Sequence, residues 1–172
     1  MKLKEKISID LEEFLTTGKF DFIKLGKTKE WILNNFADPD GYEEHPKIIK
    51  DDVWTYGNIE FHFYNNKLFL IFSDNLDILK GGKSLTLKKW ILESPEKLTL
   101  NDMISALNNK HIDFHKKTNK MEQLTVQLIL ESGVNLGFAL EQHLNEDYED
   151  FLERCQKTNQ DKYILCSFSL NN

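Results

Sequence analysis

Residues 53–72 read VWTYGNIEFHFYNNKLFLIF, a pattern that indicates a core built around a β-sheet. Ile59, Phe61 and Phe63 alternate with polar residues, which is typical of a strand with one buried face. The Asn65-Asn66 pair that follows favours a tight hairpin turn. We therefore predict three consecutive strands, at 53–56, 59–64 and 68–72.

Helix start signals lie on both sides of this stretch. Thr28 is placed to cap a helix that runs to about Phe36, and Thr99 with Asp102 is placed to cap a helix over the apolar-periodic run at 100–107. Three further strand-like runs follow the second helix, so the order helix, strand, strand, strand occurs twice. The expected fold class is α+β, with antiparallel sheets and helices packed on one face. We expect 1–172 to be a single domain, and half-units at 20–92 and 98–170 are one way to divide it. The three further strands are expected at 112–115, 124–130 and 134–140.

Other segments complete the expected order of elements. We predict a helix at 7–17, a strand at 85–92 and a last strand at 163–170. An acidic helix is expected to run from a cap at Asn145 to about Lys157. Its inward residues are expected to be Tyr148, Phe151, Leu152 and Cys155.

Composition limits the class of protein. The chain has 172 residues, of which 40% are hydrophobic and 12% aromatic, so it has enough apolar surface to fold rather than remain disordered. It has no apolar run of the roughly 20 residues that a membrane span needs, and no signal-peptide core near its start. Cys155 and Cys166 lack metal-binding spacing and are expected to be reduced thiols. These features predict a cytoplasmic protein.

Charge is distributed unevenly along the chain. Residues 121–153 contain eight acidic residues and no Lys or Arg, whereas the formal net charge of the whole chain is −6. An acidic surface repels nucleic-acid phosphates and suits a basic protein partner, although a solvated helix face gives the same composition. The candidate partner-binding residues are those expected on the outward helix face, namely Glu146, Glu149, Asp150 and Glu153.

Gly81-Gly82-Lys83-Ser84 looks like the tail of a phosphate-binding loop. The leading glycine of that motif would fall at Asp77, and a strand-like segment follows where a helix should begin. We therefore exclude a phosphate-binding role for this segment.

Two other sets of residues carry functional groups. His111, Asp113 and His115 would share one face of a strand and could bind a divalent metal, but an ordinary strand with one wet face has the same pattern. Glu60 and His62 could form an acid/base pair or belong to a polar sheet face. We expect no catalytic residue, no metal and no cofactor.

A set of aromatic residues is either core or a recognition surface: Trp31, Trp54, Tyr56 and Trp90.

Several short motifs together cover about a quarter of the chain. They are Leu25-Gly26-Lys27-Thr28, Trp31-Ile32, Pro39, Trp54-Thr55-Tyr56-Gly57, Ile59-Glu60-Phe61-His62-Phe63 and Lys67-Leu68. In these motifs the chain resembles a family of small uncharacterised bacterial proteins. More loosely, the helix followed by three strands resembles the module of outer-membrane assembly lipoproteins of the SmpA/OmlA type, although we expect this chain to lack their lipoprotein signal with its lipidated cysteine.

In size, acidity and lack of a catalytic motif the chain also resembles immunity proteins of bacterial toxin systems. This resemblance implies a non-enzymatic protein that neutralises a toxin by binding to it. An acidic surface would suit the basic substrate groove of a nuclease toxin and would speed association by electrostatic steering. The alternatives are a small metal-dependent or acid/base enzyme, and a structural or regulatory interaction module.

Overall fold

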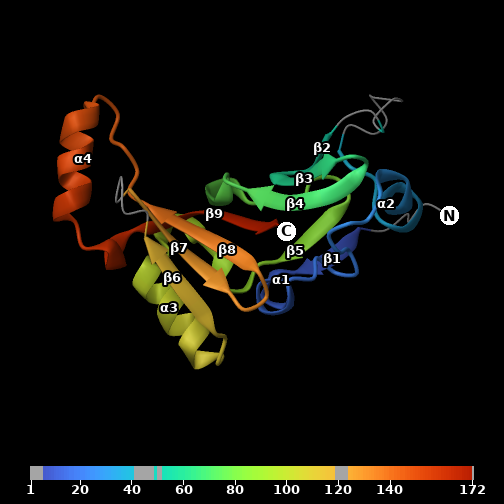
Figure 1. Ribbon diagram of the computed structural model, residues 1–172, viewed down its shortest axis with the longest axis horizontal. Helices are drawn as coiled ribbons and strands as arrows, with labels where there is room; N and C mark the ends of the chain where they lie inside the picture. Colours follow the sequence, from blue (N-terminus) through green and yellow to red (C-terminus); the bar gives the residue numbers. More distant parts are fainter. Residues whose placement is uncertain (1–5, 41–48, 50–51, 119–123, 172) are drawn as a thin grey trace.

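The computed structural model describes residues 6–40, 49, 52–118 and 124–171. It combines strands, α-helices and short 3-10 helices (Figure 1). The described elements are, in chain order, β1 (Ile7–Asp10), α1 (Leu11–Thr17), α2 (Lys29–Asn35), β2 (Val53–Tyr56), β3 (Ile59–Tyr64), β4 (Lys67–Ser73), η2 (Leu76–Ile78), β5 (Leu85–Lys88), η3 (Trp90–Glu93), η4 (Pro95–Lys97), α3 (Leu100–Asn109), β6 (Phe114–Thr118), β7 (Thr125–Leu130), β8 (Val134–Ala139), α4 (Tyr148–Lys157), η5 (Gln160–Lys162) and β9 (Ile164–Asn171).

A seven-stranded antiparallel sheet runs through the molecule in the order β2-β3-β4-β9-β8-β7-β6. The strands β2 to β4 start from one edge, and the strands β6 to β8 start from the other. The last strand, β9, lies between β4 and β8 and joins the two groups into one sheet (Figure 1). The predicted α+β class is confirmed, and the order helix, strand, strand, strand is present in both parts of the chain.

The hairpin formed by β3 and β4 follows directly from its sequence. Ile59, Phe61 and Phe63 are buried, while the residues between them are half-buried, so the alternation marks one core face. Asn65 and Asn66 have φ angles of 47° and 64°, which is the left-handed pair that a two-residue hairpin turn requires. The predicted strands and turn are confirmed here.

The helices α2 and α3 begin at their predicted caps. The Thr28 hydroxyl accepts the Trp31 amide at 3.1 Å. Thr99 and Asp102 form a reciprocal capping box. The helices α1, α2 and α3 share one hydrophobic core with the inward side chains of the sheet, so the prediction of helices on one face holds for these three.

The predicted helix at 7–17 is wrong in its first turn. Asp10 is the N-cap, because its carboxylate accepts the amides of Glu12 and Glu13, so the helix begins at Leu11. The residues before it form β1, which pairs in parallel with β5 as a separate two-stranded sheet. The predicted strand at 85–92 is also too long, because a 3-10 helix begins at Trp90, which has a φ of 51°.

The boundaries near β6 and α4 differ from the predictions as well. β6 begins at Phe114, after His111 at a φ of 55°. The helix α4 begins at Tyr148 and is capped by Asp147, whose carboxylate accepts the Asp150 amide, while Asn145 has a φ of 75°. Figure 1 shows α4 at one end of the molecule, and its buried residues lie outside the shared core. The prediction that Tyr148 packs inward is wrong, since it is 58% exposed.

Candidate functional site

The helix α4 is held to the body by a few specific contacts. Phe151 and Cys155 form its buried side. The hydroxyl of Tyr163, just before β9, donates to the Cys155 carbonyl at 3.1 Å. Leu152 and Arg154 are half-buried, and the remaining residues of α4 are exposed.

Glu146 belongs to these holding contacts. Arg154 donates from Nε to Oε1 at 2.7 Å and from Nη2 to Oε2 at 2.8 Å, and the His143 amide donates to Oε2 at 3.0 Å. These bonds to the Arg154 guanidinium lower the pKa of Glu146 to about 2. The side chain is only 12% exposed. The structure thus uses Glu146 to fix the start of α4, and its carboxylate does not point outward with the other acidic residues.

The other three predicted residues lie on the exposed side of α4. Glu149 and Asp150 are exposed, and within the described part of the chain neither carboxylate has a hydrogen-bond or ion-pair partner. Glu153 pairs with Lys157 one turn later, and this contact lowers the pKa of Glu153. Two unpaired carboxylates therefore mark the first turn of the helix.

Two exposed apolar side chains lie in the same stretch of the chain as these carboxylates. Leu144 is 93% exposed, and Tyr148 is 58% exposed at the first position of α4. Both positions follow β8 in the stretch that leads into the helix. We call Leu144, Tyr148, Glu149 and Asp150 the α4 surface.

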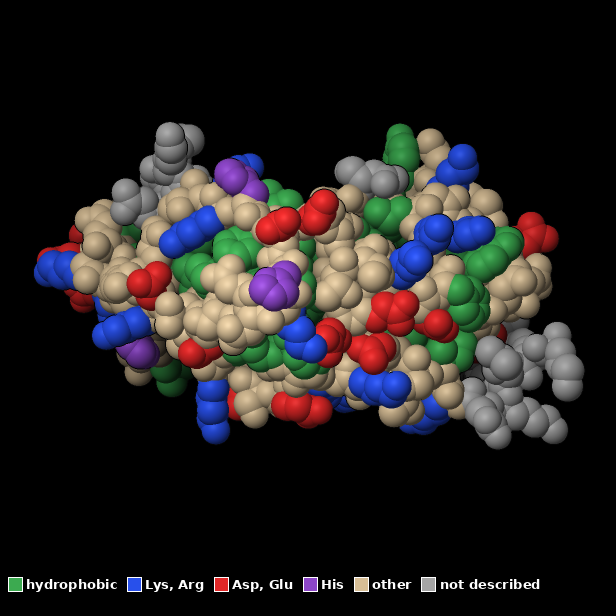
Figure 2. Space-filling view, turned by 90° about the horizontal axis from the view of Figure 1, so that it is seen from below, with side chains coloured by type: hydrophobic (Ala, Val, Ile, Leu, Met, Phe, Trp, Pro, Cys, Tyr) green, Lys and Arg blue, Asp and Glu red, His purple; other side chains and the backbone are tan. Residues whose placement is uncertain are grey.

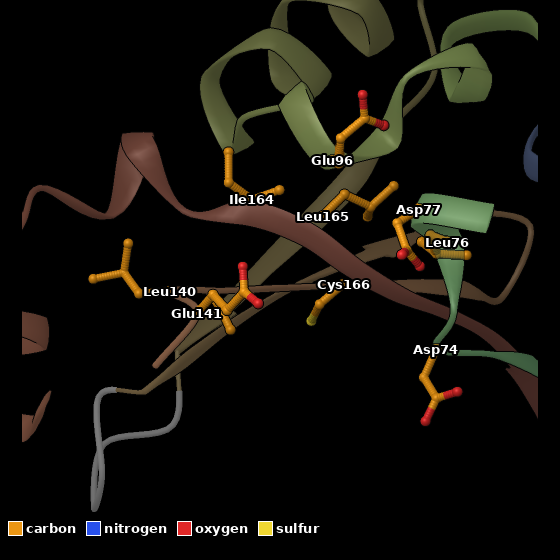
Figure 3. Close-up of a pocket in the computed structure, with 10 residues that line it drawn as sticks. Asp74, Leu76, Asp77, Glu96, Leu140, Glu141, Ile164, Leu165 and Cys166 are labelled. Carbon is orange, nitrogen blue, oxygen red and sulfur yellow. The ribbon is translucent and has the colours of Figure 1, made fainter. Parts of the chain in front are cut away.

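A groove of about 400 Å³ lies where β8 and β9 meet η2 and η4. Its lining is partly apolar and contains four carboxylates, from 74–77, 96 and 141, but no Lys or Arg. Figure 3 shows these side chains around the opening. We call it the acidic groove, and its lining residues are Asp74, Leu76, Asp77, Glu96, Ala139, Leu140, Glu141, Ile164, Leu165 and Cys166.

The sequence predictions missed this groove. Its acidic residues lie at 74, 77, 96 and 141, so three of them fall outside the acidic stretch at 121–153. Only the insertion of β9 between β4 and β8 brings these segments together. Glu141 is the one acidic residue of the groove that lies within the acidic stretch at 121–153, so it was the only signal of the groove in the charge pattern.

Cys166 contributes a thiol to the acidic groove. It occupies the bulge between β8 and β9, and its Sγ donates to the Gly137 carbonyl at 3.3 Å. Partial burial raises the pKa of this thiol, and the Asp74 carboxylate adds to the effect. Cys155 is buried, and burial raises the pKa of its thiol too. Both cysteines are free thiols, and their raised pKa values disfavour nucleophilic chemistry at neutral pH.

The Gly81-Gly82-Lys83-Ser84 segment has a structural partner in place of a phosphate. Asp40 accepts the Gly57 amide at 2.7 Å and the Lys83 amide at 2.9 Å. Its carboxylate therefore occupies the position where these amides would hold an external anion. This contact agrees with the exclusion of a phosphate-binding role.

Glu60 and His62 do form a pair, with Nε2 and Oε2 at 2.7 Å on the outer face of the sheet. The edge of the His62 ring lies near Phe69 and Phe72, with ring centroids 6.4 Å apart in both cases. A proton can pass between the two side chains. The side chains around the pair, however, are those of an ordinary sheet surface.

The proposed metal ligands are not brought together. His111 lies in a turn, Asp113 in a loop and His115 in β6. Among the described residues there is no group of three His, Cys, Asp or Glu side chains that could hold a metal ion.

The aromatic set is mainly core. Trp54 and Tyr56 are buried, and Trp31 and Trp90 pack against the same core.

On the face seen in Figure 2, acidic and basic side chains are interspersed with hydrophobic ones between them. That face therefore offers no extended surface of one charge.

Comparison with known proteins gives no relative. No family model matches the chain, and neither a curated protein nor a solved structure matches it. In the described part of the chain, no helix has the length and apolar character needed to cross a membrane.

Proposed function

We propose that this chain is a non-enzymatic cytoplasmic binding protein that uses the α4 surface to engage a basic protein partner. In its most concrete form, it is an immunity protein that neutralises a bacterial toxin. The observation that carries this proposal is the position of α4 outside the shared core, with exposed Leu144 and Tyr148 in the same stretch of the chain as the unpaired carboxylates of Glu149 and Asp150.

The α4 surface combines the two parts of a protein interface. Tyr side chains are frequent energetic anchors in interfaces, because they bury a large area at a small cost in conformational entropy. Carboxylates around such an anchor attract a basic partner from a distance and orient it. The same charges repel nucleic acid, which favours a protein as the partner.

The contact between Glu146 and Arg154 supports this role. It fixes the loop before α4 to the helix itself by two short bonds. A surface that is ordered before binding loses less entropy on association. The α4 surface is therefore suited to rapid binding of a preformed basic site.

The test is capture of the partner. Tagged protein would be recovered from the source cells, and also after co-expression with the product of the neighbouring gene, with mass spectrometry of what is retained. We expect one basic protein at equal stoichiometry, released by high salt. The paired change Glu149→Lys and Asp150→Lys should abolish retention, whereas Glu30→Lys, an exposed acidic residue on α2, should not. Recovery of no protein, or equal retention by both variants, would refute the proposal.

A second candidate rests on the outer face of β2 to β4. Val53, Tyr64 and Phe69 are exposed there, and Val53 lies opposite His62 in the sheet. A structural or regulatory module could dock through this apolar face. Its binding would change little with salt, whereas association through the α4 surface should slow steeply above an ionic strength of about 0.1 M, where the screening length is about 10 Å.

A further inference from the structure

We infer that the outer edge of β6 binds an extended acidic segment of a protein, which joins the seven-stranded sheet as a further strand antiparallel to β6. This edge is separate from the α4 surface and has the opposite charge. The inference therefore goes beyond the proposed function and does not depend on it. It rests on the unpaired backbone groups of β6 and on the unpaired basic side chains of the same strand.

The backbone of β6 has hydrogen-bonding groups that no other strand uses. β6 is the last strand at one edge of the sheet and pairs with β7 on one side only (Figure 1). The Glu131 amide donates to the Asp113 carbonyl at 3.0 Å, so these two opposed residues form a hydrogen-bonded pair. Such pairs alternate along an antiparallel ladder. Residues 115 and 117 therefore bond to β7, whereas the N–H and C=O groups of residues 114, 116 and 118 point outward.

The opposite edge of the sheet is closed in a way that β6 is not. The Phe63 amide donates to the Asp52 carbonyl at 2.7 Å, so by the same alternation the Thr55 carbonyl of β2 points outward. The Asp40 amide donates to that carbonyl at 2.8 Å. Among the described residues, no group bonds to the outward side of β6. An open edge of this kind is a template for strand addition.

The side chains of β6 give this edge a positive charge. His115, Lys116 and Lys117 are exposed, and their side chains have no hydrogen bond or ion pair with any described residue. By contrast, Lys110 pairs with Glu12 at 2.6 Å. Opposite charges on directly opposed residues stabilise a pair of strands, so the β6 edge is complementary to an acidic strand. The residues that lie opposite the basic ones on β7 are all uncharged, namely Gln127, Leu128 and Ile129.

The lysines also determine which strand is excluded. Lysine on an edge strand is a common protection against pairing between identical edges. If two copies of β6 paired antiparallel about Lys116, the two Lys116 side chains would lie opposite each other, and each Lys117 would lie opposite a His115. Like charges in these positions are destabilising. The edge therefore disfavours a second copy of this chain and favours a strand of the opposite charge.

The register defines the segment that fits. In an antiparallel strand, the residues opposite Lys117, Lys116 and His115 follow one another in that order, and acidic residues suit all three positions. The next residue lies opposite Phe114, which is half-buried and packs against the core, so an apolar residue suits it. The expected segment has three successive acidic residues followed by an apolar one.

The test is an NMR titration of ¹⁵N-labelled protein with a short peptide in which three glutamates are followed by a valine. We expect shifts centred on β6. In the free protein the amides of residues 114, 116 and 118 should exchange with solvent faster than those of 115 and 117, and the peptide should slow only the first set. A peptide with glutamine at each glutamate should bind at least about fivefold more weakly.

Methylation of the peptide backbone separates strand addition from attraction by charge alone. Methyl groups on the peptide nitrogens opposite Phe114 and Lys116 remove donors that face β6, and should weaken binding at least about tenfold. Methyl groups on the nitrogens opposite His115 and Lys117 face away from the sheet, and should weaken binding by less than about twofold. The two peptides have the same charge and composition.

Two changes at one residue make the same separation in the protein. Lys116→Gln removes the charge but keeps the outward amide, and should weaken binding about two- to fivefold. Lys116→Pro removes the amide as well and should weaken binding at least about tenfold. Because this N–H points outward, the bonds between β6 and β7 are kept. Urea unfolding checks that both variants fold, and the methylated peptides decide the question if the proline variant does not.

Three results would overturn the inference. They are equal binding of the two methylated peptides, protection of amides outside β6 in place of those on it, and no change of any β6 amide at saturating peptide. Glu149→Gln with Asp150→Asn should bind the peptide within about twofold of the wild-type protein, because these residues belong to the α4 surface. Loss of the captured partner and loss of peptide binding are thus independent outcomes, so the proposed function and this inference can fail separately.

Discussion

Replacing Gly57 with alanine should destabilise the protein far more than replacing Gly26, although both residues have positive φ angles of 65° and 86°. An added Cβ at Gly57 would lie 2.1 Å from the Lys80 carbonyl oxygen and 2.5 Å from the Gly82 nitrogen. An added Cβ at Gly26 would meet nothing within 4 Å. Comparing the two variants therefore separates the cost of disturbing the close packing around Asp40 from the cost of a left-handed backbone, which both positions share.

The expected magnitudes follow from the contacts. A left-handed backbone costs a non-glycine residue about 1–2 kcal/mol, which both variants incur. The Gly57 variant must also displace the 80–82 loop and so weaken two hydrogen bonds, from the Gly57 amide to Asp40 and from the Asn58 amide to the Lys80 carbonyl. The first, to a charged group, contributes about 1.5–3 kcal/mol and the second about 0.5–1.5 kcal/mol. We expect a loss of about 3–6 kcal/mol for Gly57→Ala and about 1–2 kcal/mol for Gly26→Ala.

Urea unfolding followed by tryptophan fluorescence measures both values, because the chain has three tryptophans. Equal free energies of unfolding for the two variants, within about 0.5 kcal/mol, would refute the packing argument. Inorganic phosphate provides a second check. Since Asp40 already accepts the amides of this segment, added phosphate should leave the unfolding midpoint of the wild-type protein unchanged.

Three further predictions test other parts of the structure. Thr99→Ala removes one half of the capping box with Asp102 and should lower the free energy of unfolding by about 1 kcal/mol, measured by urea titration. Phe61→Ala, at a fully buried site, should cost about 3–5 kcal/mol, whereas Phe69→Ala, at a side chain 41% exposed, should cost less than about 1 kcal/mol in the same assay. The pKa of Glu146 is lowered from 4.5 to about 2, so its contact stabilises α4 above pH 4.5 and is lost as the pH falls toward 2. The protection factors of the α4 amides in hydrogen exchange, taken relative to the intrinsic exchange rate at each pH, should fall over that range, and Glu146→Gln should remove this pH dependence.

Much of the fold could be predicted because its signals are local. The alternation at Ile59, Phe61 and Phe63 depends only on which face of a strand is buried, and this pattern is read directly from neighbouring residues. The caps at Thr28 and Thr99 are equally local, since each hydroxyl bonds to an amide three residues later. The signals for such features therefore lie within a few neighbouring residues.

The missed elements depend on distant pairing. Ile7 to Asp10 looked helical because apolar residues continue from it into α1, but its backbone pairs with Leu85 to Lys88, far along the chain. No local pattern specifies a parallel pairing of two four-residue strands across that separation. Asp10 gave the one local sign of the true helix start, as an N-cap residue.

The candidate sites show the same limit for charge. A count along the sequence treats Glu146 and Glu149 alike, yet the first is bound to Arg154 and the second has no partner among the described residues. The acidic groove was invisible to such a count, because β9 brings Glu96 and Glu141 to one opening from opposite sides of α3 in the chain. What makes an acidic residue available to a partner is the lack of a cation within the fold, and that depends on tertiary contacts. The search for a basic partner should therefore start from the unpaired carboxylates of the α4 surface, and not from the acidic stretch as a whole.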